Sequence, residues 1–472
     1  MQNSLLPFLL KGTTTLIEEP QKKEQKCKDT KLKDFTISST YDVKITEITD
    51  LDIHKQRLTL IPKDFGFHQE TIIAYEINQE YFSVPRYYGI KYWGFSETNS
   101  MISGNEINVN FHGSLNDIQI ESTTTILTSI QKPPYGNMLV LPCGYGKTVC
   151  SIYIATKLKK KTIILVHKTF LIEQWIERIK QFAPTAKVGK IQQNIVEDGD
   201  FVVAMIQSIV RRNYSILSEF GFCLVDECHH LAAPYFAKAL KIIPAKFRLG
   251  LSATPERRDG LTQLLFYSMG EIAHKVEREN ENTKVSCLLY NAQKQKEIKL
   301  KNGNISLGLM LNILIKDNVR NDHILKHIVR YCSANRHIIV LSDRIIQLKW
   351  FESKLTEHNI ASSLYIGKST DEERRNAINS QIILSTFVMA KEGLDIPKLD
   401  TLIMATPKTD IEQAIGRIQR KHPNKKIPLV LDIIDTFSIF ENMRWKRHSF
   451  YKSQKLHCQT FNIDDDNMNL FI

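Results

Sequence analysis

The sequence predicts an α/β protein in which two tandem domains, each a parallel sheet covered by helices, follow a small α+β domain. Three observations predict this architecture. Short apolar segments alternate with helical stretches from about residue 111, and the alternation begins again after about residue 277. From about residue 35 to 93 the segments are short, β-branched and close to turn formers. Repeated strand–helix units form parallel sheets, and 472 residues suffice for about three domains.

The expected elements and boundaries follow the periodicity and composition along the chain. In the first α/β domain we expect strands at 138–141, 162–166, 201–205 and 222–225, and helices at 147–158 and 170–182. In the second we expect strands at 337–341, 362–366, 382–384, 402–404 and 429–431. The expected boundaries are a polar, Lys-rich and mobile segment at 1–34, the α+β domain at 35–108, the α/β domains at 109–280 and 281–445, and a tail at 446–472 with a frayed end.

The composition excludes a wholly disordered chain and a membrane-spanning one. Hydrophobic residues make up 42% of the sequence, which is enough to build a core. No apolar run approaches the ~18–20 residues of a membrane helix, so we expect no membrane partner. The start of the chain lacks a basic region and a cleavage site, so we expect no signal peptide. The net charge of +12 favours a polyanionic partner without identifying it.

The cysteines indicate an intracellular protein with free thiols. None of the eight forms a C-x-x-C pair, and a chain of this size forms a core without disulfides. Cys223 precedes the run Cys228-His229-His230. Because no second pair of ligands stands at the spacing of a zinc site, we expect no zinc.

The segment 141–148 is typical of a phosphate-binding loop. It follows a predicted strand and opens a predicted helix, so backbone N–H groups and the positive helix end can hold an anion. Lys147 is expected to reach the β- and γ-phosphates of a nucleotide, and Thr148 to bind Mg²⁺. The usual pattern has Gly where Leu141 stands. The expected nucleotide contacts are Pro142, Cys143, Gly144, Tyr145, Gly146, Lys147 and Thr148.

Two further segments complete the chemistry of the first α/β domain. Asp226 and Glu227 follow a predicted strand, where acidic side chains handle a metal ion and an attacking water. We expect Asp226 to hold Mg²⁺ and Glu227 to orient or deprotonate the water. Ser252, Ala253 and Thr254 follow another strand and suit a connector that couples the site to the domain interface.

Arg417 and Arg420 of the second α/β domain stand three residues apart. On a helix this spacing places them on one face, and guanidinium groups clamp polyanions bidentately. Apolar residues around them indicate a packed element rather than a solvated basic face. Opposite the phosphate-binding loop, both are expected to act as arginine fingers.

In their order, these segments resemble the core of superfamily 2 helicases over about residues 115–435. The matching motifs are Gln119, Gln174-Trp175, Gln207-Ser208, Asp226-Glu227-Cys228-His229, Ser252-Ala253-Thr254, Glu392-Gly393-Leu394-Asp395 and Gln413 to Arg420. The resemblance implies two RecA-like domains that bind ATP and Mg²⁺ between them. It also implies that Gln119 reads the adenine and that Gln413 couples the domains. Gly393 and Asp395 would contact the nucleotide.

A narrower resemblance concerns the branch of the superfamily. The segment 252–260 resembles the XPB-like and UvsW-like DNA helicases. The segments 83–89, 340–344 and 404–407 resemble the transcript-release helicases of poxviruses and of related large cytoplasmic DNA viruses. This implies DNA-stimulated ATP hydrolysis and 3′-to-5′ movement in transcription termination or release, repair or recombination. The implied partners are DNA strands and junctions, with nascent RNA or the transcription machinery, and the implied location is the host cytoplasm and the virion.

Nucleic-acid contacts are expected in two places. Gln207, Ser208 and Thr386 are candidate grips, because small polar groups bind phosphate without reading sequence. The α+β domain combines cationic and stacking groups, as nucleic-acid sites do, although a half-buried β-hairpin would carry the same residues. These are Arg86, Tyr87, Tyr88, Lys91, Tyr92 and Trp93.

Three other functions stay open at this point. They are an RNA helicase, a duplex translocase that separates no strands, and a nucleotide-gated binding subunit of a transcription complex. Glu227, Arg417 and Arg420 count against the last, because a subunit that uses ATP only to change shape needs no hydrolytic residues.

Overall fold

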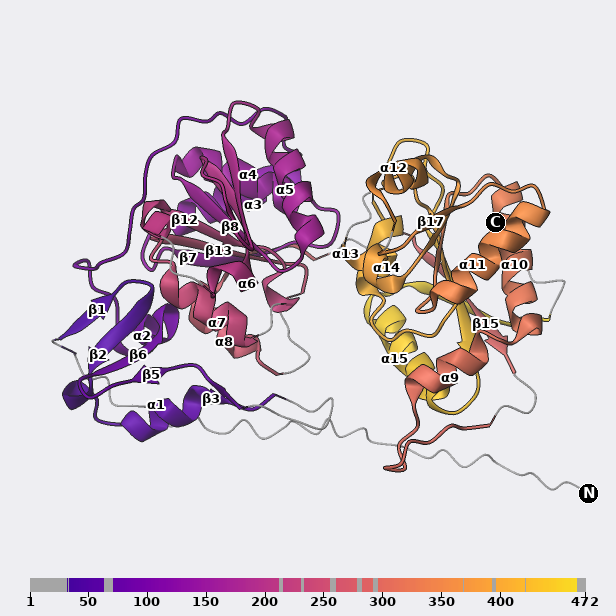
Figure 1. The fold of residues 1–472 in the computed structure, drawn as a ribbon, viewed down its shortest axis with the longest axis horizontal. Coiled ribbons are helices and arrows are strands. Elements are labelled where there is room, and N and C mark those ends of the chain that lie inside the picture. Colours follow the sequence, from indigo (N-terminus) through magenta and orange to yellow (C-terminus); the bar gives the residue numbers. More distant parts are fainter. Residues whose placement is uncertain are drawn as a thin grey trace, which may run out of the picture.

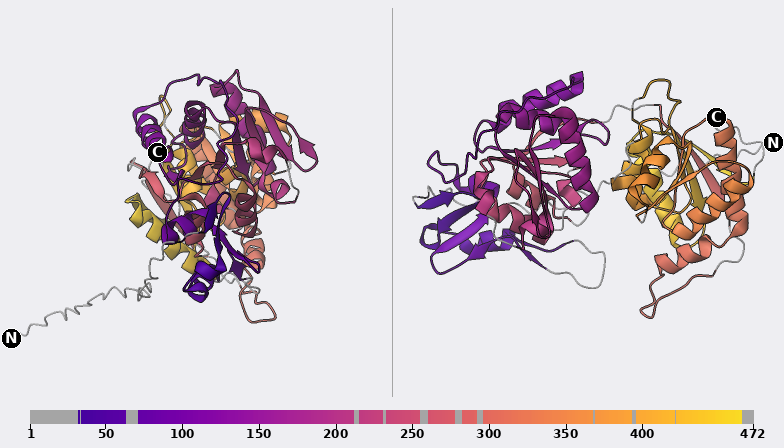
Figure 2. Two further views of the ribbon diagram at one scale, coloured as in Figure 1. Left: turned by 90° about the vertical axis from the view of Figure 1, so that its left-hand side faces the viewer. Right: turned by 45° about the horizontal axis from the view of Figure 1, so that its top comes forward.

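The computed structural model shows two α/β domains side by side and an N-terminal domain below the first (Figures 1 and 2). It describes residues 32, 34–62, 71–211, 215–230, 233–254, 260–277, 282–291, 296–367, 369–392, 396–420 and 422–464. The Lys-rich segment expected at 1–34 therefore lies almost wholly outside the described residues, as do the last eight residues of the chain.

An eight-stranded sheet forms the first α/β domain. Its strand order is β10-β9-β11-β8-β12-β13-β7-β14, and only the β10–β9 pair is antiparallel. The strands are β7 (Gly136–Val140), β8 (Thr162–Val166), β9 (Val188–Gln192), β10 (Ile195–Val196), β11 (Phe201–Met205), β12 (Phe222–Val225), β13 (Phe247–Ser252) and β14 (Ile272–Lys275). Side chains of β8 alternate between the two faces, since Ile163 joins one core cluster and Ile164 the other.

Helices cover both faces of this sheet, as a parallel sheet requires. One face is covered by α3 (Asp117–Ile130), α4 (Lys147–Leu158) and α5 (Thr169–Phe182). The other is covered by α6 (Ile206–Ile209), α7 (Ala233–Ile242) and α8 (Thr262–Met269).

A seven-stranded, wholly parallel sheet forms the second α/β domain, in the order β17-β18-β16-β19-β20-β15-β21. Its strands are β15 (Lys284–Tyr290), β16 (Ile338–Leu341), β17 (Ser363–Tyr365), β18 (Ile382–Ser385), β19 (Thr401–Met404), β20 (Leu429–Asp435) and β21 (His457–Asn462). On one face lie α10 (Asn318–Ser333) and α11 (Ile345–Glu357). On the other lie α12 (Asp371–Asn379), α13 (Phe387–Glu392), α14 (Glu412–Ile418) and α15 (Ile439–Ser453).

The sequence predicts a tail from residue 446 outside this domain, but the chain belongs to the domain as far as residue 462. Helix α15 continues to Ser453, and β21 pairs in parallel with β15. Arg447 explains the packing, because its Nε lies 2.8 Å from Oδ2 of Asp432 on β20 and both side chains are buried. The Tyr451 hydroxyl donates to the same oxygen. A small helix, α9 (Leu307–Leu314), packs on the start of α15 through Leu311, Leu314 and Phe440.

The N-terminal domain is a four-stranded antiparallel sheet in the order β1-β2-β6-β5, with two helices and a two-stranded ribbon. Its elements are β1 (Phe35–Ile37), β2 (Thr40–Lys44), α1 (Leu51–Arg57), β3 (Thr59–Leu60), β4 (Ile72–Ile73), β5 (Glu76–Ile77), β6 (Tyr81–Pro85) and α2 (Arg86–Trp93). Its core includes Leu264 and Tyr267 of α8, so the domain is packed against the first α/β domain.

The nucleic-acid contacts expected from Arg86, Tyr87 and Tyr88 are wrong, because these side chains are buried. Arg86 donates to the carbonyl oxygens of Ser38, Ala245 and Lys246 at 2.5, 2.9 and 3.2 Å. It therefore ties the N-terminal domain to the segment before β13. The residues also begin a helix rather than a β-hairpin.

Candidate nucleotide site between the two α/β domains

The phosphate-binding loop leads from β7 into α4. Gly144 and Gly146 have φ of +87° and +88°, a conformation that other residues rarely adopt. Helix α4 begins at Lys147, as expected. The Lys147 Nζ donates to the Leu141 carbonyl oxygen at 3.2 Å, across the loop. An anion in this loop would meet an ammonium group and the start of a helix together.

Gln119 is held against the same loop by the N-terminus of α3. It forms a capping box with Asn116, in which each side chain accepts a backbone N–H of the other residue at 3.0–3.1 Å. Its Nε2 donates to the Tyr145 carbonyl oxygen at 3.3 Å. A methyl group on Gly146 would lie 2.3 Å from Nε2, so any larger residue there would displace the Gln119 side chain. The expected adenine-reading residue thus borders the loop.

Asp226 and Glu227 lie at the carboxyl end of β12. The Trp175 Nε1 donates to Oδ2 of Asp226 at 2.8 Å, and Asp226 is 8% exposed. Glu227 has a φ of +43°, which is uncommon for a non-glycine residue and typical of functional turns. Its Oε1 lies 3.5 Å from the Lys147 Nζ. The acidic pair after β12 and the loop after β7 therefore face one another across the carboxyl end of β13, the strand between them.

The charged groups at this site shift one another's pKa values. Burial and the neighbouring Glu227 raise the pKa of Asp226 to about 6, although bonding to Trp175 and the charge of Lys147 oppose the rise. Burial alone would lower the pKa of Lys147, but nearby groups, chiefly Glu227, outweigh it and raise that pKa. Clustered perturbed groups of this kind are typical of a functional site.

The donor set suits Mg²⁺. The cation prefers oxygen ligands, is held by one or two carboxylates and keeps several waters. Asp226 supplies a buried carboxylate whose pKa is raised, so a cation bound beside it would stabilise its charged form. Thr148, the second residue of α4, supplies a hydroxyl beside the loop. These residues therefore fit the metal that the sequence predicts.

A short polar chain connects the acidic pair to β13. His229 Nδ1 lies 3.5 Å from Oε2 of Glu227 and 2.8 Å from Oγ of Ser252. The Ser252 hydroxyl donates to the Thr254 carbonyl oxygen at 2.6 Å. Ala253 lies between them, half-buried. The candidate coupling segment is thus in contact with the candidate hydrolytic residues.

Arg420 of the second α/β domain reaches the phosphate-binding loop. A methyl group on Gly144 would lie 3.0 Å from Cγ of Arg420 and 3.4 Å from its Nε. Arg417 lies close enough for its charge to oppose protonation of Lys147, and its Nε donates to the Ala390 carbonyl oxygen at 2.8 Å. Figure 1 shows α13 and α14 on the side of the second domain that faces the first. Both arginines are therefore at the boundary between the domains.

One detail of the arginine prediction is wrong. Helix α14 ends at Ile418, so Arg420 lies beyond it and shares no helix face with Arg417. The Gln419 side chain donates to Oγ1 of Thr283, in the segment before β15. Gln413, expected to couple the domains, lies on α14 and is 9% exposed.

The candidate nucleic-acid grips lie at strand ends. Gln207 is the second residue of α6, after β11, and donates to the His167 carbonyl oxygen at 3.3 Å. Ser208 is 7% exposed, and its hydroxyl accepts the Gln193 N–H at 2.8 Å. Thr386, half-buried, precedes α13, and its hydroxyl accepts the Met389 N–H at 3.4 Å. Ser208 is therefore engaged within the protein.

Gly393 and Asp395, two of the expected nucleotide contacts, lie outside the described residues. Within the described ranges, no group of three His, Cys, Asp or Glu side chains could hold a metal ion. The described helices include none long and apolar enough to cross a membrane.

Sequence reasoning assigned no role to two residues that shape the site. Trp175 orients Asp226, and only a tertiary contact reveals this. Asn116 caps α3. The sequence does contain a signal for this cap, because an Asn three residues before a Gln is the pattern of a capping box.

Two family models match the chain. The model "Type III restriction enzyme, res subunit" matches residues 112–257, and "Helicase conserved C-terminal domain" matches residues 320–422. The first range contains the phosphate-binding loop and the acidic pair. The second contains Arg417 and Arg420.

Several curated relatives are viral. A protein of Acanthamoeba polyphaga mimivirus, named as an ATP-dependent RNA helicase, is 34% identical over 87% of this chain and 83% of its own length. A protein of Invertebrate iridescent virus 6 named as a helicase is 26% identical over 73% and 82%. An African swine fever virus protein named as an ATP-dependent RNA helicase is 25% identical over 68% and 70%.

Solved structures share the fold. S. cerevisiae Dbp5 bound to RNA and ADP BeF3 matches with a TM-score of 0.53 at 15% identity, over 75% of this chain and 91% of that one. The restriction-modification enzyme LlaBIII bound to DNA also matches with a TM-score of 0.53, at 16% identity, over 74% of this chain and 32% of that one. With both sheets, the two matched models and the viral relatives in agreement, the chain belongs to the superfamily 2 helicases.

Proposed function

We propose that this protein is an ATP-driven DNA helicase or translocase, with 3′-to-5′ movement, acting in viral transcription termination or transcript release, repair or recombination. One observation supports the proposal that the protein is driven by ATP. Arg420 of the second domain borders Gly144 of the phosphate-binding loop, while Glu227 and Lys147 lie 3.5 Å apart in the first. Groups for binding phosphate, activating water and stabilising the developing charge thus come from two domains.

The proposed roles follow from the geometry. Lys147 and the loop N–H groups bind the phosphates of ATP, and Gln119 contacts the adenine. Glu227 orients or deprotonates the attacking water, and its neighbour His229 connects that event to Ser252. Thr148 and Asp226 would hold Mg²⁺, which when bound neutralises phosphate charge.

Domain closure couples hydrolysis to movement in this proposal. Arg417 and Arg420 stabilise charge on the transferring phosphoryl group only while the domains are together. Opening and closing then shifts the grip of each domain along a strand. Gln207 and Thr386 remain candidate grips, one on each domain. Ser208 could serve through its backbone, since its hydroxyl is engaged.

The choice of DNA is part of the proposal. It is supported by the resemblance of residues 252–260 to DNA helicases. The mimivirus and swine fever virus relatives carry the name RNA helicase, which favours RNA as the second candidate. The fold does not distinguish DNA from RNA as the substrate, so the ATPase experiment must do so.

The test is the steady-state ATPase rate with Mg²⁺, alone and with single-stranded DNA, duplex DNA or RNA. We expect DNA to stimulate the rate, and Lys147→Ala to abolish it. Arg417→Ala and Arg420→Ala should each lower it by about 10³-fold or more. Lys180→Ala, on the exposed side of α5, is the matched control and should behave as wild type.

Three results would change the proposal. Stimulation by RNA alone would make the protein an RNA helicase. A slow rate that no nucleic acid changes would favour a nucleotide-gated binding subunit. An Arg417→Ala protein with the wild-type rate would exclude the arginine-finger role of that residue.

A further inference from the structure

The outer face of α15 and the turn after it carry an uncompensated positive charge. From 442 to 462 the chain has five Lys or Arg residues and no Asp or Glu. Arg447 is buried against Asp432, and Arg444 pairs with Glu441 at 3.2 Å. The other three are exposed, and no ion pair joins them to another described residue. They are Lys446, Lys452 and Lys455.

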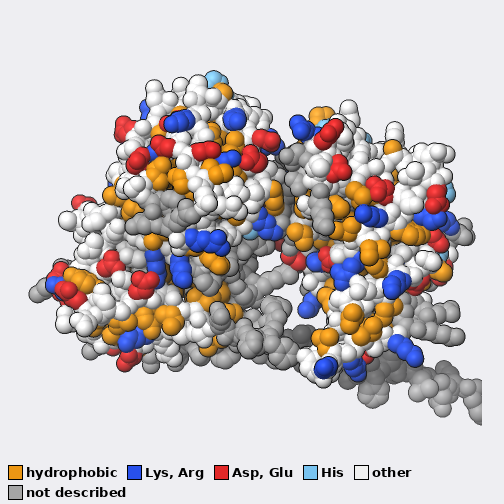
Figure 3. Space-filling view, in the orientation of Figure 1, with side chains coloured by type: hydrophobic (Ala, Val, Ile, Leu, Met, Phe, Trp, Pro, Cys, Tyr) orange, Lys and Arg blue, Asp and Glu red, His pale blue; other side chains and the backbone are white. Residues whose placement is uncertain are grey.

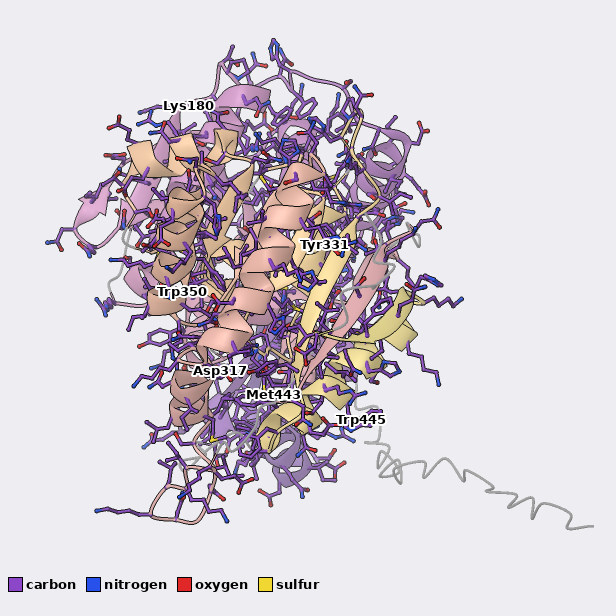
Figure 4. All side chains as sticks on the ribbon, turned by 90° about the vertical axis from the view of Figure 1, so that its right-hand side faces the viewer. Lys180, Asp317, Tyr331, Trp350, Met443 and Trp445 are labelled. Atoms are coloured by element: carbon purple, nitrogen blue, oxygen red, sulfur yellow. The ribbon has the colours of Figure 1, made fainter. Side chains whose placement is uncertain are left out.

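Trp445, which precedes Lys446 on α15, has 57% of its surface exposed. The guanidinium of Arg444 lies 5.3 Å from the centroid of its ring, and the His448 ring meets it edge-on at 6.3 Å. One turn away on the outer face stand Asn442 and Ser449, which are small and leave the ring open. Figure 4 shows Trp445 near the outline of the second domain and Met443 further in.

Trp445 is not one of the buried residues that attach α15 to the domain. The buried side of α15 is formed by Phe440, Arg447 and Tyr451, and α9 packs on its start through the cluster around Phe440. In Figure 3, basic and hydrophobic side chains interleave on the lower part of the second domain, where Figure 1 places α9. An exposed aromatic ring on a basic helix is typical of a surface that binds unpaired nucleotides.

We propose that the outer face of α15 binds a single-stranded segment of nucleic acid outside the path between the two domains. One base stacks on Trp445, and Lys446, Lys452 and Lys455 contact the backbone phosphates. Trp445 and Lys452 are seven residues apart, about 10 Å along a helix, which accommodates a few nucleotides. This inference rests on the proposed function, because it assumes that the motor acts on nucleic acid.

The test measures the affinity of the full chain, without nucleotide, for labelled oligo(dT) and oligo(U) by fluorescence anisotropy over a range of salt concentrations. Trp445→Ala should weaken binding about 10-fold, and Trp445→Phe should restore most of it. Lys446→Ala with Lys452→Ala should reduce the slope of log affinity against log salt by about 1.4, since each contact to a single strand contributes about 0.7.

The controls match these changes elsewhere on the surface. Tyr235→Ala removes an exposed ring from α7, and Lys180→Ala with Lys349→Ala removes two exposed lysines from α5 and α11. Both should bind as wild type. All variants should keep the wild-type melting temperature, because the substituted side chains are exposed.

The outcomes separate this inference from the proposed function. If the α15 variants bind with wild-type affinity and salt slope while nucleic acid stimulates the ATPase, the α15 site is excluded and the motor stands. If Trp445→Phe binds as poorly as Trp445→Ala, the stacking role is excluded. If the wild-type protein neither binds nor is stimulated by any nucleic acid, the proposed function itself fails.

Discussion

Arginine side chains of this protein fall into two groups that differ in burial. Arg86, Arg248, Arg320 and Arg447 are at most 1% exposed. Each donates hydrogen bonds inside the protein, as when Arg320 binds Asp435 through its Nε at 2.6 Å and its Nη2 at 2.8 Å. Such groups fasten one element to another, because a buried cation is costly unless it is paired or hydrogen-bonded. The two arginines at the domain boundary are only partly buried, and this leaves them able to meet a ligand.

A buried histidine makes stability depend on pH. His327 of α10 is 4% exposed and stacks on Tyr331, and burial together with nearby cations lowers its pKa to about 4. The unfolded chain, with a pKa of about 6.5, binds the proton more readily between these values. Stability is therefore complete above about pH 6.5 and falls as the pH approaches 4, by about 2 kcal/mol at pH 5.

His327→Phe should remove this part of the pH dependence. Urea unfolding between pH 7.5 and 4.5, followed by fluorescence, measures it. His358→Gln, at an exposed position on the C-terminal side of α11, should keep the wild-type slope. Identical slopes in wild type and His327→Phe would contradict the prediction.

Helices and strands with an apolar pattern could be predicted from the sequence, while those fixed by a distant partner could not. Helix α4 and the strands β8, β11 and β12 have the expected bounds, because buried parallel strands are short apolar runs. Helix α15 looked like a solvated basic tail, since nothing near Arg447 in the sequence indicates Asp432. Strand β21 is an edge strand of mixed polarity, HCQTFN, and carries no clear period.

The same distinction applies to the candidate site. Its loop and acidic pair could be predicted because local spacing determines them. Arg420 could not be placed correctly, because the end of α14 depends on where the chain turns toward Thr283. The expected contacts of Arg86 and Tyr88 failed for a related reason, since cationic and aromatic residues form interfaces within a protein as readily as with nucleic acid.

The Arg447–Asp432 pair fastens α15 to the second domain. Arg447→Met should lower the free energy of unfolding of that domain by about 3 kcal/mol, because it leaves Asp432 buried and charged without its partner. Adding Asp432→Asn should recover most of the loss, since the uncompensated charge disappears. Chemical denaturation of the single and double variants measures both. Equal losses in the two variants would show that packing, rather than charge, dominates.

At the scale of the whole molecule, the N-terminal domain and the first helicase domain share one core. Tyr88 of α2 meets the ring of Tyr267 of α8 edge-on at 4.8 Å. Arg248 of β13 donates to the Ser39 carbonyl oxygen at 2.9 Å, while Arg86 donates in the opposite direction. Hydrogen bonds are therefore donated across the interface in both directions, and we expect the two parts to unfold together.

Arg86→Met should separate them. Three carbonyl oxygens would lose a charged donor, which costs about 3 kcal/mol or more. The variant should then show an additional, earlier thermal transition and faster chymotryptic cleavage between residues 94 and 116, which include Phe95 and Phe111. Lys91→Met, an exposed position on the same helix, is the control. A single transition at the wild-type temperature in Arg86→Met would contradict the shared core.

The pairing of β15 with β21 has a mechanical consequence. These are the first and last strands of the second helicase domain, and they run parallel with six residues of each in register. A tension applied between the linker before Lys284 and the chain after Asn462 pulls the two strands in opposite directions along their length. All of their hydrogen bonds are then loaded at once in shear, rather than one after another as in unzipping. The second helicase domain should therefore resist unfolding when a force acts between its two ends.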